Sequence, residues 1–324
     1  MNKNKIFNDT FIFFIIFFIT LSFFSVELVP PTKKFDIHQI KKILYEQYNK
    51  SDYECYISNF KGTYCTGEPN SIGGIIIYYP FYKIFYYPYN FLVMSLINAI
   101  IFAVSVFLNY KISKSFVLSL LPFFLLPLID FFFNFVGHTF TFLFISLSIY
   151  SYIRNNKKRF VLFLMPLALL RPEAIIFLLG MLIFDYCKTK RINAFYLISC
   201  FTFILLICTS QYISYKDPLA QLKYNINKEI TEKNIKNFGV HRIILSFIFY
   251  LITLITTLLI VFYNTKKELS FMFMLMFTFY TFLFLIRSIA MFCCYYKIYI
   301  VILPFTIVAF KNYLKIKFKN NIKI

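Results

Sequence analysis

The acidic side chains best placed to act as a catalytic base gather in one polar stretch near the N-terminus. A carboxylate in such a stretch can take a proton from a hydroxyl group, which is general base catalysis. Asp36 is the first candidate because it closely follows the first apolar run, and Asp52 is the alternative. Asp36 can instead cap a short amphipathic helix over residues 36–48. The acids between residues 29 and 90 are Asp36, Glu46, Asp52, Glu54 and Glu68.

Cationic side chains that can hold a phosphate occur later in the chain. Arg171 stands with Pro172 and Glu173 between two apolar runs, and Arg287 and Lys297 flank the last short segment expected on the outer side. An Arg at membrane depth is costly unless it has a partner or an anionic ligand. The same cations can instead pair with Glu173 or extend to lipid headgroups. Substrate-binding or supporting roles are expected for His38, Glu68, His138, Glu173, His241 and Arg242.

Several common site types are missing from the sequence. With 7 glycines in the chain, there is no Gly-rich phosphate loop, and no Ser/His/Asp or His/Cys metal pattern appears. No metal ligand is therefore assigned, although the loop acids leave a divalent ion open as a cofactor. Cys55 and Cys65 share the polar stretch, and a disulfide between them also stays open.

The composition predicts the elements that must position these residues. The 324 residues are 60% hydrophobic and 22% aromatic, with a mean hydropathy of +0.69. A soluble domain cannot bury that much apolar surface. The net charge of +20 does not indicate nucleic acid, because the basic residues lie largely between apolar runs. We therefore predict an all-α, polytopic transmembrane bundle that forms one integral membrane domain over residues 1–324.

About 9–11 membrane passes are expected from the apolar runs. The first extracytoplasmic loop would cover about 29–90 and the second about 215–242. The expected passes are 7–28, 91–109, 116–133, 139–153, 160–170, 173–186, 193–214, 243–263, 269–286 and 297–310.

Charge placement favours two short helices around Arg171 over one continuous helix through 160–186. With two helices, the basic clusters between the passes all fall on the side of the N-terminus, as the positive-inside rule requires. Both termini are then cytoplasmic, and the expected location is a prokaryotic cell membrane. These clusters include Lys3/Lys5, Lys111/Lys114, Arg154/Lys157/Lys158/Arg159, Lys188/Lys190/Arg191, Lys266/Lys267 and the C-terminal lysines from Lys311 onward.

Three features in this order resemble a known family. They are the acid after the first helix, the motif Arg171-Pro172-Glu173-Ala174 after a basic turn, and the run from Lys297 to Pro304. The chain resembles the GT-C superfamily of integral membrane glycosyltransferases. This superfamily includes protein mannosyltransferases, aminoarabinose transferases of lipid A and polyprenyl-phosphate-mannose-dependent mannosyltransferases. The stretch Tyr79-Pro80-Phe81-Tyr82 is similar to a Pro-rich segment that follows the family's first-loop acid.

The resemblance implies an inverting hexosyltransferase that uses a polyprenyl- or dolichyl-phosphate sugar. The acceptor would be an extracytoplasmic glycan, lipid or protein of the cell envelope. Asp36, or alternatively Asp52, would be the general base, and Arg171, Arg287 and Lys297 would bind the donor phosphate. The sequence departs from the family pattern at Lys297, where many members have Arg. The other partner expected is the lipid bilayer, and no nucleic acid is expected.

Two other function classes stay open. A transporter of lipid-linked glycans or small solutes also carries intramembrane charges, but it would be expected to show an inverted repeat with broken helices in both halves. A non-catalytic subunit of a glycan assembly machine would tolerate replacement of both Asp36 and Arg171.

Overall fold

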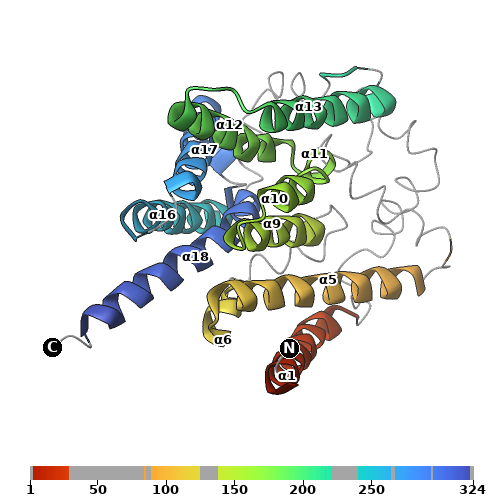
Figure 1. Cartoon of the computed structure of the whole chain (residues 1–324). Coiled ribbons are helices and arrows are strands. Elements are labelled where there is room, and N and C mark those ends of the chain that lie inside the picture. The colour runs from red at the N-terminus through yellow and green to blue at the C-terminus, as the bar shows by residue number, and fades with distance from the viewer. Residues whose placement is uncertain are drawn as a thin grey trace.

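Helices are the only regular elements in the described part of the chain. The computed structural model describes residues 3–28, 84, 89–124, 138–215, 217–219, 240–263, 267–292 and 295–321. Every regular element within these ranges is a helix, and no strand occurs there (Figure 1). The predicted all-α class is confirmed for these residues.

The expected pass 116–133 is not one helix in its described part, which is divided at Leu120 into two helices of four residues each. Residues 125–133 lie outside the described residues. The helices are otherwise close to the predicted apolar runs. They are α1 (Lys3–Leu28), α5 (Tyr89–Ser113), α6 (Phe116–Ser119), α7 (Leu121–Phe124), α9 (His138–Ile153), α10 (Lys157–Leu164), α11 (Leu167–Leu170), the 3-10 helix η2 (Pro172–Ala174), α12 (Ile175–Thr189), α13 (Ala194–Tyr215), α16 (Val240–Tyr263), α17 (Lys267–Phe292) and α18 (Tyr295–Asn321).

The segment between α9 and α13 is broken, as the charge pattern predicted. α11 ends at Leu170, Arg171 is non-helical with φ −147° and ψ 80°, and η2 begins at Pro172. The residue before a proline is pushed away from helical conformation, which explains the break at Arg171. One continuous helix through 160–186 is therefore wrong. The expected first half, 160–170, is itself divided, because α10 ends at Leu164 just before Pro166.

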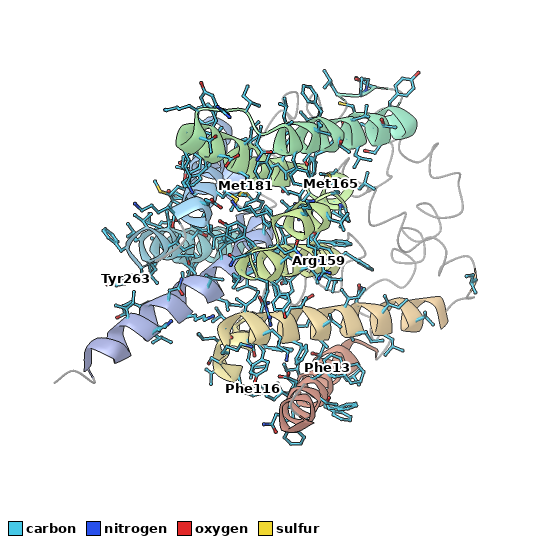
Figure 2. The ribbon with its side chains drawn as sticks, viewed as in Figure 1. Phe13, Phe116, Arg159, Met165, Met181 and Tyr263 are labelled. Carbon is cyan, nitrogen blue, oxygen red and sulfur yellow. The ribbon has the colours of Figure 1, made fainter. Side chains whose placement is uncertain are left out.

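Contacts between side chains show that α1 and α5 run in opposite directions. Asp9 near the start of α1 forms an ion pair with Lys111 near the end of α5. The ring of Phe13, one turn further along α1, lies 5.4 Å from the ring of Phe107, one turn earlier in α5. Figure 2 labels Phe13 on α1, beside α5.

α5 and α9 run in the same direction. The rings of Phe102 and Phe142 lie 5.8 Å apart, and the Asn109 amide nitrogen lies 3.5 Å from the Ser146 hydroxyl oxygen. Both pairs advance along the two helices together. The end of α9 is therefore at the same side of the bundle as the end of α5.

α16 and α18 are also parallel. α17 runs in the opposite direction and leads from the end of α16 to the start of α18. Thr256 donates to Thr306 at 3.2 Å, and the rings of Tyr263 and Tyr313 lie 5.2 Å apart. The Ser270 hydroxyl, near the start of α17, donates to the Ile260 carbonyl near the end of α16.

The basic clusters of different helices meet at one end of the bundle. Lys311 of α18 donates to the Ile112 carbonyl at the end of α5 at 2.6 Å. Lys157 at the start of α10 pairs with Glu268 at the start of α17, and the charge of Lys188 near the end of α12 also acts on Glu268. We call this side the basic end. Its described cations are Lys111, Lys114, Arg154, Lys157, Lys158, Arg159, Lys188, Lys190, Arg191, Lys267, Lys311 and Lys315.

Two helix segments in the described residues are long and apolar enough to cross a bilayer, namely Leu96–Ser113 and Ala194–Tyr212. Shorter apolar helices cover Asn8–Leu21, Thr139–Ile153 and Tyr250–Tyr263. Helices of this length and composition also occur in the cores of soluble proteins. By themselves they give weak support for membrane association, and they do not establish the expected 9–11 passes.

Candidate functional site

The acidic candidates lie outside the described residues. This holds for Asp36 and Asp52 as possible bases, and for His38 and Glu68 as supporting residues. Cys55 and Cys65, whose pairing the sequence left open, also lie outside the described residues. These predictions remain predictions.

The cationic candidates occupy helix ends opposite the basic end, which we call the far end. α9 begins at His138, and its other terminus carries Tyr152 at the basic end. By the same helix directions, Arg287 lies in the later part of α17 and Lys297 at the start of α18. His241 and Arg242 occupy the start of α16. Their backbone positions are described, whereas the side chains of these five residues lie outside the described part.

Arg171 and Glu173 are brought together at the break between α11 and η2. The Arg171 Nη1 atom lies 3.6 Å from Glu173 Oε1, and the two side chains are 10% and 17% exposed. This separation is an ion-pair distance, longer than a hydrogen bond. The structure therefore shows the pairing that the sequence offered as the alternative to phosphate binding by Arg171. Phosphate binding itself stays a prediction. The pair places a guanidinium inside the bundle.

The backbone around the break holds Arg171 in place. The Arg171 amide donates to the Leu167 carbonyl at 2.6 Å, and the Arg171 carbonyl accepts from the Ala174 amide at 2.9 Å. The 15 residues of α12 span about 22 Å at the helical rise. The ring of Phe184 in α12 lies 5.9 Å from the ring of Phe271, one turn after Glu268 in α17. The C-terminal end of α12 is therefore at the basic end, and Arg171 lies about 20 Å from it.

A buried guanidinium at the far end can serve as an anion site. Arg presents five N–H donors in a fixed planar arrangement that matches the oxygens of a phosphate. Glu173 offsets the cost of burying the charge of Arg171. Within the described residues, no three His, Cys, Asp or Glu side chains form a group that could hold a metal ion.

Sequence reasoning missed the best-defined charged cluster in the structure. The Tyr152 hydroxyl donates to Glu268 Oε2 at 2.7 Å, and Lys157 Nζ donates to Glu268 Oε1 at 3.0 Å. Burial alone would raise the pKa of Glu268, but these hydrogen bonds and the charges of Lys157 and Lys188 lower it overall. An acid standing directly after Lys266 and Lys267, at the start of an apolar run, was the available signal.

Comparison with known proteins adds no residue to these two clusters. The chain matches no protein-family model, no curated protein and no solved structure.

Proposed function

We propose that the chain is a polytopic membrane glycosyltransferase of the GT-C type, with its transfer site at the far end. The observation that carries the proposal is the Arg171–Glu173 pair, which lies inside the bundle where the helix is broken. In the proposed reaction, Arg171 binds the phosphate of a polyprenyl- or dolichyl-phosphate sugar. Arg287 and Lys297, which stand on helix ends at the same side, would contribute further positive charge.

Exposed apolar side chains on α13 support placement in a bilayer. Ile198, Phe201 and Leu205 follow one another at helical spacing, and Phe201 and Leu205 are each 66% exposed. Apolar surface of this extent is unfavourable in water and is normal against lipid. We therefore expect this face of α13 to contact acyl chains.

α16 carries a similar face. Its exposed residues recur every three or four positions, so they share one side of the helix. On the inner side, Thr256 and Thr306 form a hydrogen bond between buried side chains, a type of contact that joins helices in membranes. The exposed residues are Ile244, Phe247, Ile248, Leu251, Ile255, Leu258, Val261 and Phe262.

The orientation follows from the charges. The basic end would face the cytoplasm under the positive-inside rule. The far end, with Arg171, would then lie toward the extracytoplasmic side, where lipid-linked donors and acceptors meet. Asp36, or Asp52, belongs to the long loop expected on that side.

The reaction would be a single displacement. An acceptor hydroxyl loses its proton to the Asp36 carboxylate while its oxygen forms a bond to the anomeric carbon of the sugar. The bond from that carbon to the phosphate oxygen breaks, and the lipid phosphate leaves. Arg171 stabilises the charge that develops on the leaving phosphate. Attack from the opposite face inverts the anomeric configuration.

A transfer assay on the full chain in lipid vesicles tests this function. Radiolabelled polyprenyl-phosphate sugars serve as donors and a membrane extract of the source organism supplies acceptors. Arg171→Lys keeps the charge but loses the bidentate geometry, so we expect the donor KM to rise by about tenfold or more. Asp36→Asn should lower kcat by at least about a hundredfold. Arg159→Lys, a matched change on an exposed side chain at the basic end, should leave transfer unchanged.

Three outcomes would contradict parts of the proposal. Equal transfer by wild type and Asp36→Asn would exclude Asp36 as the base and promote Asp52. An unchanged donor KM in Arg171→Lys would remove Arg171 from the phosphate site. Folded protein that transfers no label from any donor would contradict the enzyme assignment and favour a transporter or an assembly subunit.

A further inference from the structure

Some cations of the basic end are committed to contacts within the bundle. Lys111 pairs with Asp9, Lys157 pairs with Glu268, and Lys311 donates to the Ile112 carbonyl. These three side chains join helices to one another. Their positive charges are therefore partly used in holding the fold.

A second group of cations at the same end points to solvent. Lys158 and Arg159 at the start of α10 are exposed, as are Lys190 and Arg191 after α12. Among the acids in the described ranges, none forms an ion pair with these four side chains. Figure 2 labels Arg159 on α10.

The turn between α12 and α13 is ordered by its own hydrogen bonds. Asp185 Oδ2 accepts from the Asn193 side-chain nitrogen at 2.8 Å, and the Thr189 hydroxyl accepts from the Arg191 amide at 3.2 Å. Lys190 ends α12 with a left-handed φ of 57°. Asp185 therefore accepts a hydrogen bond from Asn193, and the side chains of Lys190 and Arg191 are exposed to solvent.

Apolar side chains lie beside these cations. Ile192 directly follows Arg191 and is 63% exposed, and Phe195 and Tyr186 on either side of the turn are also exposed. Leu162, one turn after Arg159 in α10, is also exposed. Basic residues interleaved with exposed apolar ones fit the boundary between headgroups and acyl chains. A nucleic acid would satisfy the charges but would leave Ile192 and Leu162 in water.

We propose that this surface binds anionic phospholipid headgroups. It consists of Lys188, Lys190, Arg191 and Ile192 at the α12–α13 turn, with Lys158 and Arg159 of α10. The cations would contact headgroup phosphates, and Ile192 would enter the acyl region next to the exposed face of α13. The inference rests on the proposed membrane placement, but it does not depend on sugar transfer. Anionic lipids attract each nearby cation enough to favour their binding by about fivefold.

The lack of tryptophan in the chain allows a direct test. The sequence contains 0 Trp, so Ile192→Trp introduces a single indole at the centre of the surface. The full chain would be reconstituted in phosphatidylcholine vesicles in which either a phosphatidylglycerol or a phosphatidylcholine carries brominated acyl chains. Bromine quenches indole fluorescence on contact. For each brominated lipid, the mole fraction that gives half-maximal quenching is measured. We expect this fraction to be about tenfold or more lower for phosphatidylglycerol than for phosphatidylcholine.

Two variants serve as controls. The first variant adds three substitutions to Ile192→Trp, namely Lys188→Gln, Lys190→Gln and Arg191→Gln. It should lose the preference for phosphatidylglycerol over phosphatidylcholine, while both lipids still quench the indole. Leu205→Trp, at the exposed apolar face of α13, should be quenched equally by both lipids.

The contrary outcomes are also defined. Equal quenching of Ile192→Trp by both lipids would overturn the proposal, and so would loss of the preference on adding an oligonucleotide. No quenching by either lipid would overturn both the surface and the membrane placement. Normal lipid preference in a protein that transfers no sugar would contradict only the proposed enzyme activity.

Discussion

The Glu268 carboxylate joins three helices through two hydrogen bonds. It accepts from Tyr152 of α9 and from Lys157 of α10, while it stands itself at the start of α17. A hydrogen bond with a charged partner contributes about 1.5–3 kcal/mol. Because the side chain is 19% exposed, the ion pair is only partly screened by solvent.

Replacement of Glu268 by Gln is expected to destabilise the fold. Gln keeps the shape but removes the negative charge that faces Lys157 and Lys188, so the free energy of unfolding should fall by about 1–3 kcal/mol. Denaturant unfolding in detergent micelles measures the change. Lys158→Gln, an exposed neighbour of Lys157, is the control and should change stability little. Equal stabilities of wild type and Glu268→Gln would contradict this role.

The same carboxylate predicts a dependence of stability on pH. The pKa of Glu268 is lowered in the folded protein from its ordinary value of 4.5, so the folded state favours the charged form. Its contribution is therefore fully present above about 4.5 and decreases as the pH falls through the lowered folded value. Thermal unfolding of wild type and Glu268→Gln at a series of pH values should show their Tm difference shrinking in acid. A difference that grows in acid would reverse the assigned sign.

Residue-level chemistry was predictable from sequence only where the partners are close along the chain. The Arg171–Glu173 pair could be proposed because the two residues almost adjoin. Glu268 could not be assigned, because Lys157 and Tyr152 lie 111 and 116 positions away. Such contacts depend on how the helices pack, which charge spacing alone does not specify.

At the scale of elements, α12 approaches α17 closely at a glycine. A Cβ atom on Gly180 would lie 3.0 Å from Met272 Cγ and 3.3 Å from Met272 Cα. The Met272 side chain can adjust its position, but its backbone cannot move without shifting α17. Gly180 thus sets the distance between the two helices, and through α12 it affects where Arg171 is held.

Gly180→Ala is expected to destabilise the protein by about 1–3 kcal/mol, the usual cost of overpacking. That cost exceeds the gain of up to about 1 kcal/mol that Ala brings inside a helix. Unfolding in micelles measures the difference, with Ile183→Ala on an exposed part of the same helix as the control. If Gly180→Ala were more stable than wild type, α17 would have to shift at Met272 to make room for the added methyl group.

Helix positions were predictable because apolar length and proline act locally. The predicted segments 7–28, 193–214 and 243–263 each lie within or close to one helix, and the break at Arg171 follows from Pro172. The second break was missed, although Pro166 was visible in the sequence. The prediction treated 160–170 as one apolar run, whereas α10 ends at Leu164 and α11 restarts after Pro166.

At the scale of the whole molecule, the exposed face of α13 provides a test of the proposed membrane placement. Leu205→Asp places a charge near the middle of the apolar segment Ala194–Tyr212. In a membrane this costs about 2.5–3.5 kcal/mol, so we expect the fraction of protein that resists alkaline extraction from membranes to fall. Leu205→Ile is the control. Unchanged extraction and improved solubility of Leu205→Asp would indicate an aqueous surface instead.

The meeting of the basic clusters at one end of the bundle could be predicted from the sequence for the described residues, whereas the membrane topology that it implies stays a prediction. Sequence grouped the basic clusters on one side, and the described contacts bring Lys111, Lys157, Lys188 and Lys311 to one end. Which helices would be neighbours was not predictable. Nearly every helix is apolar, so many pairings satisfy the same hydrophobic pattern.

The contact between Lys311 and the Ile112 carbonyl also orders events during synthesis. The two residues are 199 positions apart. At about 5–20 residues per second, a ribosome adds Lys311 on the order of 10–40 s after Ile112. During that interval the Ile112 carbonyl at the end of α5 lacks its hydrogen bond from Lys311. The contact between α5 and α18 therefore forms only after Lys311 has been synthesised, and a product truncated before Lys311 lacks it.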